Sequence, residues 1–227
     1  SGVIGIFIGD TALFAAMNRL GPRRAGVLFA THALFSVVLA YFFLDETQWG
    51  WTLVGSSLLV SGVMTAIFFG KRKTELHAWE ANQSQLRSGV ALGLLAALCQ
   101  AVATLMLKPL METNIDAVAA SAVRMTTAFV LHQIIFMLGF NIARAYLPLN
   151  KKVFLLVLAN AALSMVLGMT LILQALKYGD AGLVAILSSV SPVLVLPLLW
   201  LIYKRSPATG AWLGAALTVL GTMLILR

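Results

Sequence analysis

Eight long apolar segments constrain the fold of this chain more than any other feature. In hydrocarbon every backbone amide must be paired within its own segment, and runs this uniform exclude the alternating strands of a membrane barrel. Eight spanning helices of roughly 20 residues would use about 160 residues of the chain. We therefore expect an all-α, polytopic membrane helical bundle. The segments lie at about 2–19, 24–44, 49–70, 89–107, 117–140, 153–177, 180–203 and 207–226.

Composition supports this class and excludes others. Of the 227 residues 60% are apolar and 11% are charged, and mean hydropathy is +0.94, which is not typical of a soluble enzyme, a DNA-binding domain or a disordered protein. The net charge of +8 is confined to short breaks between the apolar segments, so we expect membrane lipid and no nucleic acid as a partner. The single cysteine, Cys99, permits no intramolecular disulfide.

The chain also contains an internal repeat. A shift of 159 positions aligns residues 6–64 with residues 165–223 without a gap, over three helices and their connections. The second copy is preceded by two more helices, at 89–107 and 117–140, and the first copy is not. This predicts about eight helices present of a ten-helix inverted five-plus-five repeat, because five helices per unit force opposite orientations.

The repeat defines the expected organisation of the chain. Residues 1–70 are predicted to form the last three helices of a first unit, residues 71–88 a connecting loop, and residues 89–227 a complete second unit. Since Ser1 and Gly2 stand at the start without a methionine, we expect an N-terminally truncated chain whose parent carries about 60 more residues. Such a chain alone is expected to be deficient in transport.

Several stretches resemble one transporter family. The stretch ALFAAMNRLGPRRAGVLFATHALFSVVLAYFFLDETQWGWTLVGSSLLVSGV resembles the third to fifth helices of EamA-type transporters of the drug/metabolite transporter superfamily. The second half of the chain resembles a full unit of that family, and the stretches that carry this resemblance include AVAASAVRMTTAFVL, QALKYGDAGLVAILSSVSPVLVL and GAWLGAALTVLGTMLI. Two departures stand out: the family's Glu-Pro pair in the fourth helix is His32-Ala33 here, and the Gly-Glu that closes the ninth helix is Lys204-Arg205. In the first copy of the repeat the corresponding helix is still followed by acidic residues, Asp45 and Glu46.

The resemblance implies a secondary transporter that exports or exchanges small metabolites, amino acids or drugs by alternating access at a central midplane cavity. It implies an integral membrane protein, which we expect in the bacterial inner (plasma) membrane, with a small-molecule substrate, no cofactor and no enzymatic activity. Two alternatives are an integral-membrane enzyme acting on lipid or peptide and a transport-inactive truncated protein. The nucleophile, zinc and phosphate-loop motifs that an enzyme would carry are absent from the sequence.

Two charged residues fall inside apolar segments, where a charge costs about 2.5 to 3.5 kcal/mol on insertion scales. Facing a shared cavity, Asp10 and Arg124 could pair, or Asp10 could carry a proton while Arg124 holds an anionic substrate group. The alternative is that Arg124, an arginine that is common at this place in the family, snorkels to the membrane surface, and that Asp10 hydrogen-bonds a neighbouring helix end. Proton coupling through Asp10 is thus a hypothesis that the sequence raises.

Other polar residues inside the segments are weaker candidates for the cavity, since many such residues only bridge helices. His32 lies 159 positions before Ser191, which puts polar side chains at matching points of both copies. No ligand spacing accompanies His32 or His132, so no metal site is predicted. The other candidates for the cavity are Gln100, Asn160, Gln174, Ser188 and Ser189.

Proline and glycine mark two further features. Pro192 and Pro197 remove backbone hydrogen bonds within one segment and predict a kink that could act as a hinge or stay static. Glycines four residues apart predict close helix packing, and could also form the face of a homodimer. The pairs are Gly5/Gly9, Gly89/Gly93 and Gly210/Gly214.

The charge distribution predicts an orientation. Connections on one side hold twelve basic residues and those on the other side hold three, so the positive-inside rule puts the first side in the cytoplasm and both chain ends outside. The family resemblance implies cytoplasmic ends instead. We follow the charge count: a C-terminal reporter should be active outside the cytoplasm, and activity only in the cytoplasm would contradict this orientation. The twelve are Arg19, Arg23, Arg24, Lys71, Arg72, Lys73, Arg87, Arg144, Lys151, Lys152, Lys204 and Arg205; the three are Lys108, Lys177 and Arg227.

Overall fold

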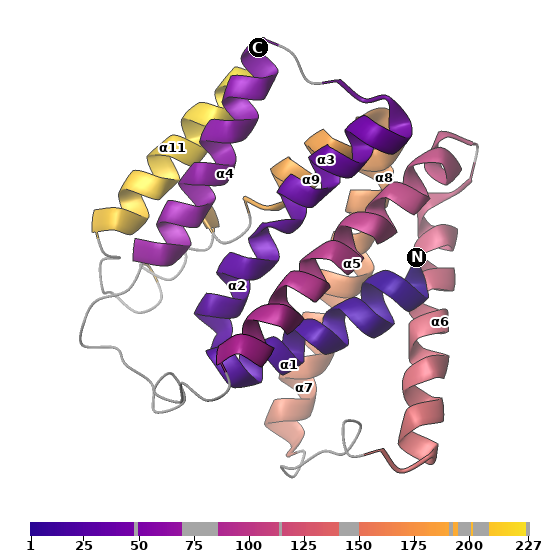
Figure 1. The fold of residues 1–227 in the computed structure, drawn as a ribbon. Coiled ribbons are helices and arrows are strands. Elements are labelled where there is room, and N and C mark those ends of the chain that lie inside the picture. Colours follow the sequence, from indigo (N-terminus) through magenta and orange to yellow (C-terminus); the bar gives the residue numbers. More distant parts are fainter. Residues whose placement is uncertain are drawn as a thin grey trace.

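The computed structural model describes residues 1–47, 50–69, 86–113, 115–140, 150–190, 193–194, 201 and 209–225, and these residues form helices and short connections without a strand (Figure 1). The predicted all-α helical membrane bundle is therefore confirmed. In chain order the elements are η1 (Gly2–Asp10), α1 (Thr11–Leu20), α2 (Pro22–Ala30), α3 (His32–Leu44), α4 (Trp51–Phe69), α5 (Leu86–Glu112), α6 (Ala117–Met137), α7 (Lys151–Asn160), η5 (Ala161–Gly168), α8 (Met169–Tyr178), α9 (Ala181–Ser188) and α11 (Thr209–Ile225).

Five helices within the described residues are long and apolar enough to cross a membrane. Two shorter apolar helices, Trp51–Thr65 and Thr209–Ile225, accompany them. The segment predicted at 24–44 is interrupted by a turn at Thr31, and most of residues 191–203, the second half of the segment predicted at 180–203, lies outside the described residues. The five long helices are Gly2–Leu20, Arg24–Leu44, Leu86–Glu112, Ala117–Met137 and Lys151–Tyr178.

The 159-residue spacing recurs in the elements themselves. Gly2 and Ala161, 159 positions apart, each begin a π-helical segment that continues directly into an α-helix. Pro22 and Ala181, again 159 apart, begin α2 and α9 after a break in the chain. Helices α5 and α6 have no earlier counterpart among the described residues. Two stretches with only a weak sequence match therefore share one succession of helices and breaks.

Helices α4 and α11 lie side by side along one edge of the molecule (Figure 1), where they make the most extensive helix contact among the described residues. A Cβ atom added to Gly55 would lie 2.8 Å from the carbonyl oxygen of Gly221, and one added to Gly62 would lie 2.8 Å from that of Gly214. Gly55 and Gly214 are 159 positions apart, as are Gly62 and Gly221. The two helices run antiparallel and meet through residues that the repeat makes equivalent, as inverted units require.

Glycines also bring η1 and α1 against α5. Gly9 faces Cys99, and Gly5 faces Ala103, at 2.7 Å from an added Cβ. Farther along α5, Gly89 faces Leu20 and Gly93 faces Leu28. The predicted packing role of these glycine pairs is thereby confirmed, since small residues let membrane helices approach closely.

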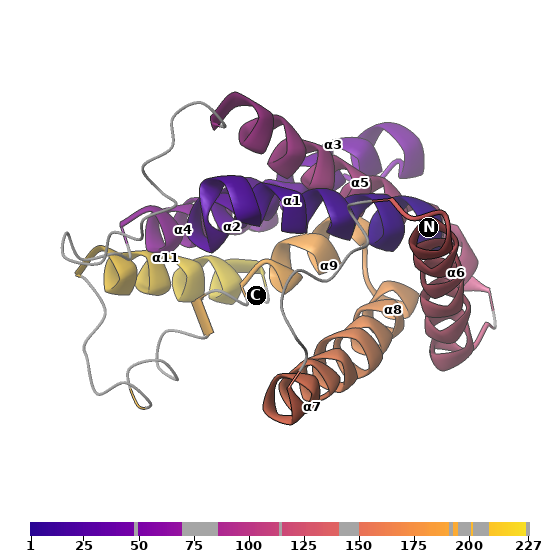
Figure 2. The same ribbon diagram turned by 90° about the horizontal axis from the view of Figure 1, so that it is seen from below.

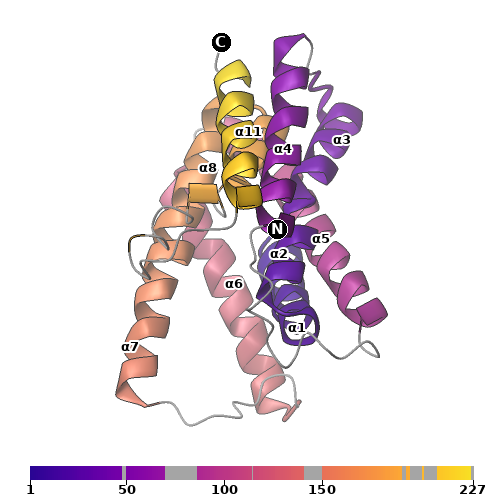
Figure 3. The same ribbon diagram turned by 90° about the vertical axis from the view of Figure 1, so that its left-hand side faces the viewer.

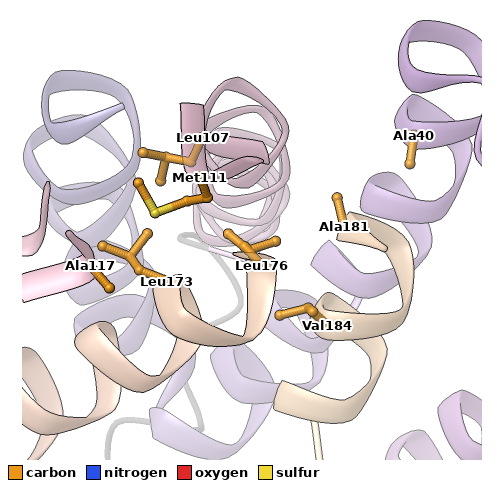
Figure 4. Packing of buried hydrophobic residues seen from close by; sticks show 8 residues of the cluster. All are labelled: Ala40, Leu107, Met111, Ala117, Leu173, Leu176, Ala181 and Val184. Carbon is orange, nitrogen blue, oxygen red and sulfur yellow. The ribbon is translucent and has the colours of Figure 1, made fainter. Parts of the chain in front are cut away.

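An apolar cluster joins five helices, α3, α5, α6, α8 and α9, at the other end of α5 (Figure 4). Met111, Leu173 and Leu176 are fully buried at the contact of α5 with α8. Ala40 of α3 faces Ala181 and Val184 of α9 in the same cluster. By contrast, α7 and η5 bury no residue and lie at the periphery of the molecule (Figures 2 and 3).

Substitution of the α4–α11 glycines should separate the two helices. In Gly62→Ala the new methyl group would lie 2.6 Å from the amide nitrogen of Thr218, which is backbone and cannot move aside. We expect a loss of about 1 to 3 kcal/mol in the free energy of unfolding, the usual cost of overpacking, measured by thermal unfolding in nanodiscs.

Gly26→Ala is the matched control, because nothing lies within 4 Å of a Cβ there. It should leave stability unchanged or raise it by up to about 1 kcal/mol through helix propensity. Equal melting temperatures for Gly62→Ala and Gly26→Ala would contradict the tight contact.

Candidate functional site

Helix α6 carries the buried arginine into the bundle. Its first turn is capped by Asp116, whose carboxylate accepts a hydrogen bond from the amide of Ala119 at 2.9 Å. The buried residues of α6 include Ser121, Arg124 and Ala128, which lie three and four residues apart and so share one face. That face packs against η1, and α6 also contacts α8.

Arg124 is only 5% exposed, so its side chain does not snorkel out of the bundle. Its Nη1 donates to the thioether sulfur of Met169 at 3.1 Å, and its buried Nε has no hydrogen-bond partner among the described residues. A thioether is a weak acceptor for a cationic group. The guanidinium is thus desolvated without the acceptors that normally compensate such a loss.

Gly5 marks the place where three elements meet. A Cβ atom added there would lie 3.4 Å from Nη2 of Arg124 and 3.7 Å from Oε1 of Gln100. Gln100, from α5, therefore joins Arg124 beside η1. Because Gly5 has no side chain, the polar ends of Arg124 and Gln100, from α6 and α5, can both lie close to η1 here.

Asp10 ends the π-helical segment of η1, and wide π-helical turns occur frequently at functional sites. Its carboxylate interacts electrostatically with Arg124 and with His132, both on α6. No ion pair joins Asp10 to Arg124 in this part of the described structure, so the direct pairing that the sequence raised as one option is absent here. The residue equivalent to Asp10 in the repeat is Met169, the partner of Arg124.

His132 was missed as a site residue by the sequence analysis. Its Nε2 lies 3.3 Å from Oγ1 of Thr11, its Nδ1 lies 2.8 Å from the carbonyl oxygen of Ala128, and its ring meets Phe7 edge-on. The spacing could have revealed it, because residues 124, 128 and 132 follow at four-residue intervals along one side of a helix. We call Asp10, Gln100, Arg124 and His132 the polar centre.

The other candidates lie apart from the polar centre. His32 is buried in α3, where its Nδ1 donates to the carbonyl oxygen of Phe29 at 2.9 Å and its ring stacks on Phe29. Ser188 and Ser189 donate to carbonyl oxygens of their own helix, α9. Asn160 and Gln174 are exposed on α7 and α8.

Three of the predicted residues lie outside the described part of the chain. They are Ser191, the predicted counterpart of His32, and the two residues of the predicted hinge, Pro192 and Pro197. Within the described ranges no three His, Cys, Asp or Glu side chains come together in a way that could hold a metal ion.

Taken with the fold, the polar centre defines a class: an integral membrane protein whose repeated helical units surround buried charge. The sequence model of the EamA-like transporter family matches residues 1–68 and 87–227. The chain therefore belongs to the EamA-like transporter family, within the drug/metabolite transporter superfamily, as the resemblance predicted.

Comparison with solved structures supports the same fold. A crystal structure titled only "Crystal structure of protein" matches with a TM-score of 0.76 at 18% sequence identity, over 98% of this chain and 73% of the other. At this identity the likeness concerns the fold alone. No curated protein matches the chain.

Two buried cations with unequal partners allow a test of what Arg124 does. Lys108 pairs with Glu112 at 3.0 Å and donates to the carbonyl oxygen of Leu176 at 3.2 Å, whereas Arg124 donates to a thioether and forms no ion pair within the described part of the chain. Arg124→Met should lower the melting temperature in nanodiscs less than Lys108→Met does. The change at Arg124 removes a buried charge that has no ion pair among the described residues, although Asp10 loses one of its electrostatic partners. Lys108→Met should lower stability by about 1.5 to 3 kcal/mol, the usual worth of a hydrogen bond to a charged group. A larger loss in Arg124→Met than in Lys108→Met would show that the guanidinium is structural.

Proposed function

We propose that this protein is a secondary transporter that exports or exchanges small metabolites, amino acids or drugs by alternating access. The observation that carries the proposal is the nearly buried Arg124, held by a weak acceptor at the contact of η1, α5, α6 and α8. Charges inside membrane segments face the interior of the bundle and mark substrate or ion pathways. Membership of a transporter family supports the same reading.

In this proposal the two related units are residues 1–70 and 89–227, joined by residues 71–88, and the substrate binds between them. The close agreement with the two stretches that match the family, 1–68 and 87–227, supports these boundaries. Many secondary transporters built from inverted repeats bind substrate near the midplane at the repeat interface.

The residues of the polar centre take different roles in the proposal. Arg124 holds an anionic group of the substrate through N–H donors that lack a strong acceptor. Asp10 carries the coupling proton, since its carboxylate can be neutralised without stranding a partner in an ion pair. Gln100 and His132 provide further hydrogen bonds at the same place.

His32 and Ser191 are proposed as a second pair of substrate contacts. Pro192 and Pro197 are proposed as a hinge that lets the segment predicted at 180–203 bend during the cycle. Asn160, Gln174 and Ser188 are kept as candidates that line the cavity in another conformation of the cycle. The proposed location is the bacterial inner membrane, as the family resemblance implies.

Transport driven by a pH gradient tests the proposal. Vesicles reconstituted with the full-length protein should accumulate labelled amino acids or monocarboxylates under an imposed gradient, and Asp10→Asn should abolish that uptake. The amide is nearly isosteric and uncharged, so folding should survive, as judged by size-exclusion chromatography.

Asp45→Asn is the matched control, because it makes the same aspartate-to-asparagine change at an exposed residue outside the polar centre. It should retain uptake. Unchanged pH dependence in Asp10→Asn would remove the proton role. A covalent product without any flux would favour an integral-membrane enzyme instead, and the absence of both would favour a transport-inactive protein.

A further inference from the structure

A carboxylate from the first matched stretch binds the start of a helix in the second. Glu46, just beyond the end of α3, accepts hydrogen bonds from the amides of Ala181 and Gly182 at 2.7 and 3.0 Å, one with each of its oxygens. The residues joined are 135 and 136 positions apart. This contact therefore ties α3 to α9 across the two units.

The contact is strong for two reasons. The first amides of a helix lack partners within the helix and carry partial positive charge, which favours an anion there. The side chain of Asp180, at the N-cap position of α9, makes no capping hydrogen bond, so Glu46 caps this helix from another one. Directly below, Ala40 packs against Ala181 and Val184, all of them buried (Figure 4).

The same corner is also held from α5. Nζ of Lys108 donates to the carbonyl oxygen of Leu176, in the last turn of α8, and pairs with Glu112. This corner borders a polar cavity of about 350 Å³, whose lining includes Asp45, Glu46, Lys108 and Asp180. The tie is therefore bordered by this polar cavity and by the buried apolar cluster that contains Ala40 and Ala181.

The repeat does not provide an equivalent tie at the opposite end. The positions 159 residues beyond Asp45 and Glu46 are Lys204 and Arg205, which have no carboxylate. The positions 159 residues before Ala181 and Gly182 are Pro22 and Arg23. Proline has no amide hydrogen to donate, so one of the two donors is missing as well. The counterpart therefore lacks the carboxylate and one of the two amides of the tie.

We propose that Glu46 is a one-sided latch that holds α9 against α3 and closes this end of the transport path. The inference rests on the proposed transport function, since the latch matters only if α9 separates from α3 during a cycle. The two ends of the path then differ in how firmly they close, although the units themselves are related by the repeat.

Labelling of engineered cysteines tests the latch. In the full-length protein with Cys99→Ala, Ala40→Cys puts a thiol directly beneath Glu46, and Leu20→Cys puts one at the opposite end, where Leu20 is buried against Gly89. A water-soluble maleimide is added in nanodiscs, where both ends are open to the reagent. Glu46→Gln should speed labelling at position 40 roughly tenfold, about the effect of losing one hydrogen bond to a charged group. Glu46→Ala, which loses both bonds, should speed it further.

Asp45→Asn is the matched control. It removes one negative charge from the same cavity, and asparagine tolerates the left-handed conformation of Asp45, whose φ is 54°. Labelling at position 40 should stay unchanged in Asp45→Asn, and labelling at position 20 should stay unchanged in all three variants.

Three results would overturn the latch. Unchanged labelling at position 40 in Glu46→Ala would show that the bonds do not hold this end closed. Equal acceleration at positions 20 and 40 would show that Glu46 only stabilises the fold, and acceleration by Asp45→Asn equal to that of Glu46→Gln would show an effect of charge alone. The labelling needs no substrate, so failure of the latch leaves the flux result standing, and absence of flux leaves the labelling result standing.

Discussion

The antiparallel contact of α4 with α11 is the constraint on which the arrangement of the other helices depends. Lipid tails are as apolar as leucine, so helices in a membrane associate through close packing and not through the hydrophobic effect. Gly55 and Gly62 on one helix and Gly214 and Gly221 on the other allow backbone-to-backbone contact. Because these positions are equivalent in the repeat, the contact relates one unit to the other in opposite orientation.

That orientation brings the two π-helical segments to equivalent places. η1 ends at Asp10 and η5 ends next to Met169, and Arg124 on α6 interacts with both residues. The two copies of the repeat thus share the same backbone elements but differ in charge. At the equivalent positions near the guanidinium of Arg124, one copy has the carboxylate of Asp10 and the other has the thioether of Met169. The same asymmetry recurs at the helix ends, where Glu46 caps α9 and the equivalent residue is Arg205.

Much of the fold could be predicted from the sequence, because length and uniform hydropathy determine which segments span a membrane. The spacing of 159 residues also located matching helix breaks, such as those before Pro22 and Ala181. The turn at Thr31 and the π-helical segments were not predicted, since local hydropathy does not report backbone hydrogen-bond spacing. Neither were the contacts of His132 with Thr11 and of Arg124 with Met169, which join residues 121 and 45 positions apart. Such partners depend on how helices rotate against one another, and a single sequence does not determine that rotation.

Distance measurements between spin labels test the central claim, that the two units face each other inverted through α4 and α11. Trp51 and Ser61 on α4 and Leu213 and Met223 on α11 are exposed and offer labelling sites that leave the glycine contact intact. The antiparallel arrangement predicts that the label at residue 51 lies closer to residue 223 than to residue 213, and that the label at residue 61 shows the reverse order. Ten residues of helix correspond to about 15 Å, which electron spin resonance in nanodiscs resolves. The opposite order at both α4 positions would mean that the units run parallel and would contradict the account.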